Sequence, residues 1–441
     1  MMLKVVKSKA LDLTRVRIPS SKSHTIRALF IASLAEGKST ILNPLISEDA
    51  ISAVRICKSF GAEIDGNKDI DEVTKVKKTE DIIESVTVAG FEGKPKTPED
   101  VLNVGNSGTT LRLGLSMAAL AEGYTVFTGD TQIRMRALDS LITAINNLGG
   151  NAFSTRNNGM APVIIKGRMK GGKTDIDAYT SQFLSSLLIS CPLLENDTEI
   201  HIIRLNEVPY AEMTLWWLEK QGIKYENDDF KRIYIYGQQN YQSFKESISG
   251  DFSSATFFMV LAAISGSEIV LENLDMNDPQ GDKLVLSILK NMGAKVSFDN
   301  DLIIIKGDGL RGKEIDMNSI PDALPAMAVA GCFAQGETRL VNVPQARLKE
   351  TDRISVMCKE LKKMGADISE IPDGLIIRRS KLTGCEVNGH YDHRIVMALA
   401  IAGLNAEGTT VIDTAEAMNI TFPEFIYMID KCGYNITLIT D

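Results

Sequence analysis

A pattern of polar loop, apolar helix and glycine turn recurs six times along the chain and constrains its fold more than any other feature. Each copy opens on a loop rich in Ser, Asp, Lys or Arg before an apolar stretch, and closes on a turn that leads toward a hydrophobic strand. The turns contain Gly61, Gly149, Gly222, Gly293, Gly365 and Gly433. The period of roughly 70 residues is too long for a solenoid and fits a βαβ unit with extra strands. We therefore predict six copies of one small α/β module.

Hydrophobic periodicity indicates the elements within each copy. Residues 26–35 and 110–121 carry apolar side chains three and four positions apart, which predicts helices with a buried face. The β-branched segments 125–127, 199–203 and 410–412 predict strands that follow such helices. The chain is therefore expected to alternate helices and strands throughout.

The length of 441 residues exceeds one ordinary core and predicts two domains of about 200 residues each. The polar segment 234–246, which has little apolar periodicity, separates three copies of the repeat from three. The segment 63–98 lengthens the first copy, and its part 93–98 is predicted to be an exposed excursion because it is rich in Gly, Pro and Lys.

Composition excludes several classes of protein. The net charge of −9 disfavours a nucleic-acid partner, because binding to a phosphate backbone depends on a basic surface. The longest apolar run, 395–404, is too short to span a bilayer, and residues 1–13 lack a signal-peptide core, so we predict no membrane association and a cytoplasmic protein. Six cysteines without C-x-x-C spacing are expected to be reduced core residues rather than disulfides or zinc ligands.

The polar openings carry the candidate chemistry, because the N-terminus of a helix attracts anions. In the string 19–27, Ser residues supply a helix cap, while Lys22 and Arg27 can lean toward the same helix start. The string 105–112 repeats this design with glycines that permit close approach of a ligand and with Arg112 one turn further on. Each string alone also fits a capped surface helix or a tight turn, so only their shared place in the repeat favours an anion site.

The second half supplies carboxylates as well as cations. Residues 346–353 pack five charges into eight positions, which alone would fit a solvated helix start. Asp322 precedes an apolar run and would otherwise be a helix cap, and His393 would otherwise be a structural histidine. All three lie at or beside a loop-to-helix opening, so the fold is expected to bring them toward common edges of the domains.

Five strings together resemble the 5-enolpyruvylshikimate-3-phosphate synthase family, also called 3-phosphoshikimate 1-carboxyvinyltransferases. They are Lys22-Ser23 with Arg27, Asn106-x-Gly108-Thr109-x-x-Arg112, Thr180-Ser181-Gln182, Lys349-Glu350-Thr351-Asp352-Arg353 and Asp392-His393-Arg394. The resemblance covers nearly the whole chain. It implies an α/β fold of two inside-out domains, each of three βαβαββ repeats, with the active site in the cleft between them. It also implies that residues 21–246 form a domain inserted into a discontinuous one, made of residues 1–20 and 247–441.

The reaction implied by the resemblance moves the enolpyruvyl group of phosphoenolpyruvate onto the 5-hydroxyl of shikimate 3-phosphate and releases phosphate. Both substrates are polyanions, which explains clustered cations in an acidic chain. By resemblance, the residues that bind shikimate 3-phosphate are Lys22, Ser23, Arg27, Thr180, Ser181, Gln182, Tyr210, Asp322, Gln345 and Lys349. Those that bind phosphoenolpyruvate are Lys22, Asn106, Gly108, Thr109, Arg112, Arg136, Gln182, Arg353 and Arg394.

The resemblance also implies the catalytic roles. Asp322 is the base toward the 5-hydroxyl, and Glu350 delivers a proton to the methylene carbon. Lys22 contacts both substrates, and His393 assists the proton transfers or orients Glu350. No metal or organic cofactor is implied, because the leaving phosphate is already part of the substrate. The implied protein is a monomer with small anionic substrates and a target of glyphosate.

Four positions depart from the family pattern, and the first is Ala137, which stands where Arg-Pro is common. Gln345 replaces an Asn that contacts the acceptor, and Ile420 stands where many relatives carry a Lys that faces phosphoenolpyruvate. Glu207 stands where a phosphate-binding Ser is common. A carboxylate beside a phosphate would repel it, so either Glu207 points away and Arg204 or Asn206 replaces the Ser, or the acceptor differs.

The sequence leaves other functions open. An enolpyruvyl transferase that acts on UDP-N-acetylglucosamine shares the fold but uses a Cys in the loop matching residues 128–137, where this chain has none. A non-catalytic scaffold of six repeats would explain the period but would leave the matched cations and carboxylates without a purpose. The sequence is also compatible with a paralogous enolpyruvyl transferase that uses a different anionic acceptor.

Overall fold

The computed structural model describes residues 1–11, 13–66 and 83–439, which fold into two compact units. We call residues 1–20 with 249–441 the split unit, and residues 21–248 the inserted unit. The second crossing lies two residues beyond the sequence-based boundary because strand β14 (Lys245–Ser247) pairs with β3 (Lys38–Leu42) of the inserted unit. No helix in the described ranges is both long and apolar enough to cross a membrane.

The predicted repeat is confirmed, because the described chain builds six four-stranded sheets with one shared strand pattern. In each sheet one edge strand is parallel to its neighbour, and the other two pairings in the sheet are antiparallel. In the inserted unit the first repeat contains α1 (Lys22–Leu34), β3, α2 (Glu48–Ser59), β4 (Glu63–Gly66) and β5 (Ser85–Ala89). The second contains β6 (Leu102–Asn103), α3 (Gly108–Ala118), β7 (Tyr124–Thr128), α4 (Asp139–Asn147), β8 (Asn151–Ser154) and β9 (Val163–Lys166). The third contains β10 (Gly172–Ala178), α5 (Ser181–Ser190), β11 (Thr198–Leu205), α6 (Val208–Lys220), β12 (Tyr225–Asp228) and β13 (Arg232–Ile235).

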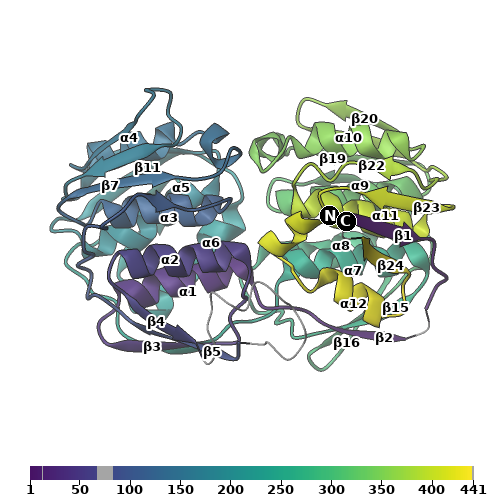
Figure 1. The fold of residues 1–441 in the computed structure, drawn as a ribbon, viewed down its shortest axis with the longest axis horizontal. Coiled ribbons are helices and arrows are strands. Elements are labelled where there is room, and N and C mark those ends of the chain that lie inside the picture. Colours follow the sequence, from purple (N-terminus) through teal and green to yellow (C-terminus); the bar gives the residue numbers. More distant parts are fainter. Residues whose placement is uncertain (12, 67–82, 440–441) are drawn as a thin grey trace. The chain divides into compact units, whose positions relative to one another are not determined.

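The split unit repeats this order with two strands from the start of the chain. Its first repeat contains β2 (Thr14–Arg17), α7 (Phe252–Ser265), β15 (Glu268–Glu272), α8 (Leu284–Met292), β16 (Lys295–Asp299) and β17 (Leu302–Lys306). The second contains β18 (Glu314–Asp316), α9 (Leu324–Phe333), β19 (Glu337–Val341), α10 (Arg353–Lys363), β20 (Asp367–Ile371) and β21 (Gly374–Arg378). The third contains β22 (Glu386–Val387), α11 (His393–Asn405), β23 (Thr409–Ile412), α12 (Phe425–Lys431), β24 (Ile436–Ile439) and β1 (Met2–Val6). Strand β1 lies between β23 and β24, so both ends of the described chain belong to one sheet (Figure 1).

Each crossing between the units follows a strand that pairs with a distant part of the chain. Strand β2 precedes α1 in the chain but pairs in parallel with β15 of the split unit. Strand β14 precedes α7 but pairs in parallel with β3 of the inserted unit. Each of these strands therefore completes a sheet of the unit that the chain is leaving.

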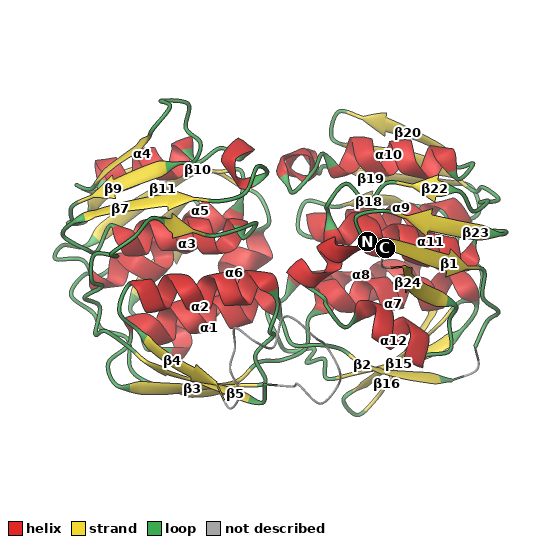
Figure 2. Ribbon diagram, viewed as in Figure 1, coloured by secondary structure: helices red, strands yellow, loops and turns green. Residues whose placement is uncertain are grey.

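In each unit the sheets lie outside a core of helices (Figure 2). The helices α1, α3 and α5 of the inserted unit, and α7, α9 and α11 of the split unit, are buried on nearly every face. A helix that is apolar all round is expected only in such a position. The predicted helices at 26–35 and 110–121 are confirmed as α1 and α3, which begin earlier, at Lys22 and Gly108. The polar openings of the sequence therefore lie at or beside the N-termini of interior helices.

The closing glycines end the second helix of each repeat. All six have positive φ, between 67° at Gly222 and 118° at Gly293. At each, the next residue donates its N–H to a carbonyl in the last turn of the helix, as Ile223 does to Leu218. This is a Schellman cap, which requires a left-handed residue and so explains the recurrence of Gly.

Gly222→Ala is expected to destabilise the inserted unit by about 1–2 kcal/mol, the usual penalty for a Cβ in the left-handed region. Its Cβ would meet no atom within 4 Å, so backbone strain is the only cost. Urea unfolding of the variant measures this loss. Gly222→Asn is the matched control and should lose less, because Asn adopts this conformation more readily. Equal losses in both variants would contradict the explanation.

Two segments differ from the sequence-based expectation. Gly93 and Pro95 are buried, so residues 93–98 are not simply exposed. The segment 234–246 is not only a linker, because Tyr241 is fully buried and donates its hydroxyl to the carbonyl of Ile189 at 2.8 Å. A short polar or Gly-rich run in the sequence gives no sign of such tertiary contacts. Residues 67–82 of the long first repeat lie outside the described residues.

Candidate active site

The interior helices of the inserted unit begin at candidate site residues. Helix α1 begins at Lys22, and the hydroxyl of Ser21 accepts a hydrogen bond from the backbone N–H of His24. Helix α3 begins at Gly108 behind the cap Ser107, and α5 begins at Ser181 behind Thr180. Because partial positive charge gathers at such helix ends, the local fold favours anions beside these residues.

Gln182 joins two of these helix starts. Its side-chain oxygen accepts a hydrogen bond from Nη1 of Arg112 at 2.6 Å, and its Nε2 donates to Oγ1 of Thr109 at 3.1 Å. Asn106, in the loop before α3, donates to Asp130 and Gln132 in the loop after β7. The structure therefore brings Thr109, Arg112 and Gln182 into one bonded group and ties the loop of Asn106 to its neighbour.

Gly108 lies against two guanidinium groups. A Cβ built on Gly108 would lie 2.5 Å from Nη1 of Arg136 and 2.7 Å from Nη1 of Arg112. Both distances are shorter than any tolerated contact, so the absence of a side chain lets both arginines approach the start of α3. We call Asn106, Gly108, Thr109, Arg112, Arg136 and Gln182 the inserted-unit cluster.

Arg27 is almost fully buried, and its guanidinium group donates hydrogen bonds to other residues of the protein. It donates to Oγ1 of Thr214 at 2.8 Å, to the carbonyl of Ser23 at 3.1 Å, to Oγ of Ser185 at 3.2 Å and to the carbonyl of Tyr210 at 2.9 Å. Burial lowers the pKa of Arg27 to about 10, which leaves it charged at neutral pH. In this state Arg27 joins α1, α5 and α6, and four of its five N–H groups are already used.

Lys22 is paired with a carboxylate that no sequence motif indicated. Its Nζ lies 3.1 Å from Oδ2 of Asp49, and both side chains are mostly buried. Asp49 lies in the first turn of α2, where an acidic residue is ordinary, so its sequence context gave no signal of a site.

Glu207 points toward the start of α5, so the alternative in which it points away does not hold in this structure. Its Oε2 accepts hydrogen bonds from Oγ of Ser181 at 3.0 Å and from Oγ1 of Thr180 at 3.4 Å. The expected substitute Arg204 is bound to Asp177 through two contacts of 2.8 Å and is half exposed. A carboxylate of the neighbouring strand thus holds the guanidinium of Arg204 in this structure.

Asn206 is the other expected substitute. It is buried, and its side-chain amide donates to the carbonyl of Tyr179 at 3.2 Å. This bond ties the end of β11 to the residue that precedes Thr180. Asn206 therefore supports the backbone at the start of α5 in this structure.

Arg353 is the centre of the candidate residues in the split unit. Its side chain is 1% exposed, and it contacts Oδ1 of Asp322 at 2.8 Å, Oε2 of Glu350 at 2.5 Å and Oδ2 of Asp392 at 2.8 Å. Burial alone would lower the pKa of Arg353, but the three carboxylates outweigh it and raise that pKa above its ordinary value. Arg353 therefore stays charged and holds the three acids together.

Two further cations reach Asp322 from other elements. Nη2 of Arg394, in the first turn of α11, lies 3.0 Å from Oδ2 of Asp322, and Nζ of Lys349 lies 3.8 Å from Oδ1. We call Asp322, Lys349, Glu350, Arg353, Asp392 and Arg394 the Arg353 network. It holds three cations and three carboxylates, so the charges balance before any substrate binds. Asp322 lies in the short helix η5 (Pro321–Ala323) and is not the cap of α9.

Asp282 is a further acid that sequence reasoning missed. It is 2% exposed in the short helix η4 (Gly281–Lys283). Burial, with a smaller contribution from the charge of Asp322, raises the pKa of Asp282 to about 6. Its context, Gln280-Gly281-Asp282-Lys283, resembles a surface turn and therefore carried no signal.

The remaining candidates occupy the split unit's helix starts and turns. Gln345 is buried in η6 (Pro344–Leu348) and donates its Nε2 to the carbonyl of Asn318 at 3.0 Å. Its Oε1 is buried and has no hydrogen-bond partner among the described residues, so it can accept from a ligand hydroxyl. His393 is buried as the first residue of α11, next to Asp392. Ile420 is buried in η7 (Ala415–Ile420).

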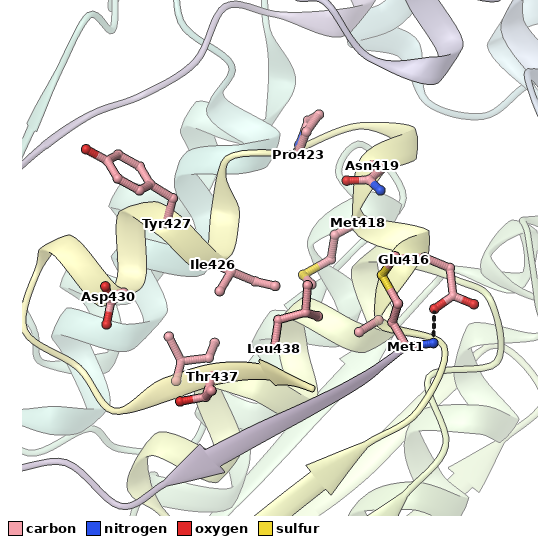
Figure 3. Close-up of a pocket in the computed structure, with 12 residues that line it drawn as sticks. Met1, Glu416, Met418, Asn419, Pro423, Ile426, Tyr427, Asp430, Thr437 and Leu438 are labelled. Carbon is pink, nitrogen blue, oxygen red and sulfur yellow. Dashed lines mark ion pairs between the residues drawn. The ribbon is translucent and has the colours of Figure 1, made fainter. Parts of the chain in front are cut away.

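A pocket in the split unit lies apart from these residues (Figure 3). Its lining comes from Met1, η7, α12 and β24 and includes Met418, Tyr427 and Leu438. The amino group of Met1 pairs with Oε2 of Glu416 at 3.0 Å. The lining contains none of the candidate site residues, so the pocket is separate from the candidate active site.

Comparisons with known proteins agree in one family. The family model described as EPSP synthase (3-phosphoshikimate 1-carboxyvinyltransferase) matches residues 7–429. A 3-phosphoshikimate 1-carboxyvinyltransferase of Acetivibrio thermocellus is 64% identical over 437 residues, with 99% of each chain covered. One from Ruminiclostridium cellulolyticum is 62% identical over 440 residues, with 100% of each chain covered. The solved EPSP synthase of Acinetobacter baumannii has a TM-score of 0.82 at 28% identity and 99% coverage of both chains.

Proposed function

Because the chain belongs to the EPSP synthase family, we propose that its two residue clusters bind and activate the substrates of that family. The enzyme transfers the enolpyruvyl group of phosphoenolpyruvate to the 5-hydroxyl of shikimate 3-phosphate and releases phosphate. The residue assignment rests on one observation. The cations of the sequence motifs lie at the starts of interior helices and of the helices next to them, where anions are stabilised.

Phosphoenolpyruvate is bound by the inserted-unit cluster together with Lys22, Arg353 and Arg394. In the inserted unit, Arg112 and Arg136 meet at Gly108, so two guanidinium groups lie at the N-terminus of α3, where a phosphate or carboxylate is stabilised. Arginine suits this role because its planar fork binds such groups through two hydrogen bonds at once.

Shikimate 3-phosphate is bound by Lys22, Ser23, Thr180, Ser181, Gln182, Tyr210, Gln345 and Lys349. The open acceptor Oε1 of Gln345 fits a ring hydroxyl, which would satisfy a buried oxygen that otherwise costs stability. Arg27 acts mainly by holding Ser23 and Tyr210 in place, because its contacts are with their backbones. It therefore positions the acceptor site from within the unit.

Asp322 and Glu350 carry the proton transfers. Asp322 takes the proton of the 5-hydroxyl, and Glu350 gives a proton to the methylene carbon while C2 is attacked. The C2–phosphate bond of this adduct then breaks, and Glu350 takes back a proton from the methyl group, which restores the double bond as phosphate leaves. In this structure Glu350 is ion-paired with Arg353. His393 assists the proton transfers or orients Glu350.

The assay for this function follows phosphate release from phosphoenolpyruvate and shikimate 3-phosphate, with mass spectrometry of the enolpyruvyl product. Release that depends on both substrates supports the proposal. Unphosphorylated shikimate and UDP-N-acetylglucosamine serve as alternative acceptors in parallel reactions. No product with shikimate 3-phosphate, or faster transfer to another acceptor, would contradict it.

A transferase with a different anionic acceptor is the second candidate. The contact between Glu207 and Ser181 favours it, because a carboxylate already lies where the acceptor phosphate is expected. The parallel acceptors in the same assay separate the two candidates.

Gly108→Ala is expected to raise the Michaelis constant for phosphoenolpyruvate several-fold, because the added methyl group displaces Arg112 and Arg136. Inhibition by glyphosate, a longer molecule than phosphoenolpyruvate, should be relieved by a larger factor. Steady-state kinetics with and without glyphosate measure both effects. Gly105→Ala is the matched control, because a Cβ there meets no atom within 4 Å, although its φ of 57° adds backbone strain. Unchanged kinetics in Gly108→Ala would exclude close contact between the arginines and the substrate.

A further inference from the structure

The carboxylate of Glu207 occupies the N-terminus of α5. The residue is 2% exposed, and its Oε2 lies 3.0 Å from Oγ of Ser181 and 3.4 Å from the backbone nitrogen of Ser181. Oγ1 of Thr180 is a third donor to the same oxygen at 3.4 Å. One carboxylate oxygen therefore accepts from three donors that an incoming phosphate would use.

The repeat sets the backbone that carries this carboxylate. Glu207 is the cap residue of α6 and has a left-handed conformation, with φ 59° and ψ 43°. Residues that follow the matching strand in four other repeats also have positive φ, namely Asn43, Asn273, Asn342 and Thr414. All four have shorter side chains than Glu. The module therefore imposes the backbone conformation, and the longer side chain at this copy reaches Ser181.

The neighbouring Arg204 pairs with another carboxylate. It is bound to both oxygens of Asp177, and its side chain is half exposed. A phosphate group that enters the start of α5 therefore meets a carboxylate that already uses its donors. Like charges at such distances repel, so the two anions cannot use Ser181 together.

We propose that Glu207 is an internal competitor of the acceptor's phosphate for Ser181 and Thr180, and that it sets the affinity for the acceptor. This inference rests on the proposed function, in which Thr180 and Ser181 bind shikimate 3-phosphate. A phosphate displaces the carboxylate because it brings more charge and three acceptor oxygens. An acceptor without phosphate leaves Glu207 in place. Glu207 therefore reduces acceptor affinity only for the phosphorylated ligand.

The test compares the Michaelis constant for shikimate 3-phosphate in the wild type, Glu207→Gln and Glu207→Ser. Glu207→Gln keeps an oxygen that can accept from Ser181 but removes the charge. Both variants are expected to lower the constant by about tenfold, which corresponds to about 1.4 kcal/mol. The constant for phosphoenolpyruvate should change little. Binding of unphosphorylated shikimate, measured by calorimetry, should stay the same in all three proteins.

Glu212→Gln is the matched control, because Glu212 is an exposed residue of the same helix and its loss changes the net charge equally. It should leave the constant for shikimate 3-phosphate unaltered. An equal gain in Glu212→Gln, or an unchanged or higher constant in the Glu207 variants, would overturn the inference. A wild type that forms no product with shikimate 3-phosphate would instead refute the proposed function. Should neither variant fold, Glu207→Asp withdraws the carboxylate by one methylene and carries the same expectation.

Discussion

Glu350→Gln is expected to lower turnover by about 100-fold or more while the Michaelis constants stay within a few-fold of the wild type. The amide keeps the shape of the side chain but cannot deliver the proton that the methylene carbon requires. It also removes one of the three negative charges around Arg353, so phosphoenolpyruvate should bind at least as well. Turnover and Michaelis constants from the phosphate-release assay measure both parts of the prediction.

Asp322→Asn should show the same division between turnover and binding, because it removes the base but leaves Arg353 and Arg394 in place. Glu370→Gln is the matched control, since Glu370 pairs with Arg347 outside the Arg353 network and its loss should leave turnover unaltered. Turnover near that of the wild type in Glu350→Gln or Asp322→Asn would remove that residue from the mechanism.

Arg353→Gln is expected to destabilise the split unit by about 3–5 kcal/mol, the usual cost of breaking a buried ion pair from one side. The variant leaves Asp322, Glu350 and Asp392 together without the guanidinium that links them, and Asp392 is fully buried. Phosphoenolpyruvate binding should be lost as well. Because the two units can unfold separately, hydrogen exchange of peptides from α10 and α11 during urea unfolding is the suitable measurement.

Arg347→Gln is the control for this loss. Arg347 also contacts two carboxylates, those of Asp352 and Glu370, but these side chains are partly exposed, and pairs in contact with solvent contribute about 0–1 kcal/mol. Arg353→Lys should recover only part of the stability, because an ammonium cannot reach three carboxylates through a planar fork. Similar losses in Arg347→Gln and Arg353→Gln would show that burial of the network contributes little.

Part of the site was accessible from sequence because its residues recur at one place in a repeated module. Lys22, Gly108, Ser181 and Arg394 lie in the first turns of interior helices, which the change from polar to apolar residues indicated. The sequence did not show which residues these side chains pair with. Asp49 and Asp282 lie in strings that also fit ordinary helix starts and turns, and only three-dimensional proximity places them near the motif residues. Asp392 belongs to a motif string, but its pairing with Arg353 was visible only in the structure.

Glu207 shows the same limit at a single residue. Its replacement of a common Ser was visible in the sequence, but the direction of its side chain depends on a left-handed backbone and on the position of α5. Neither is encoded by the neighbouring residues alone. The sequence therefore identified the position that departs from the family, and the tertiary structure decided that its carboxylate faces Ser181.

The sequence by itself determined the module, its number of copies and the ends of its helices. Apolar periodicity and left-handed glycines are local properties, so each copy carries its own signal. Only the tertiary structure decided that β2 and β14 complete sheets of the units they leave, that β1 completes the last sheet, and that Arg353 gathers three acids. These pairings join residues that lie far apart in the chain. Hydrogen bonds and ion pairs of this kind produce no recognisable pattern in the sequence around either partner.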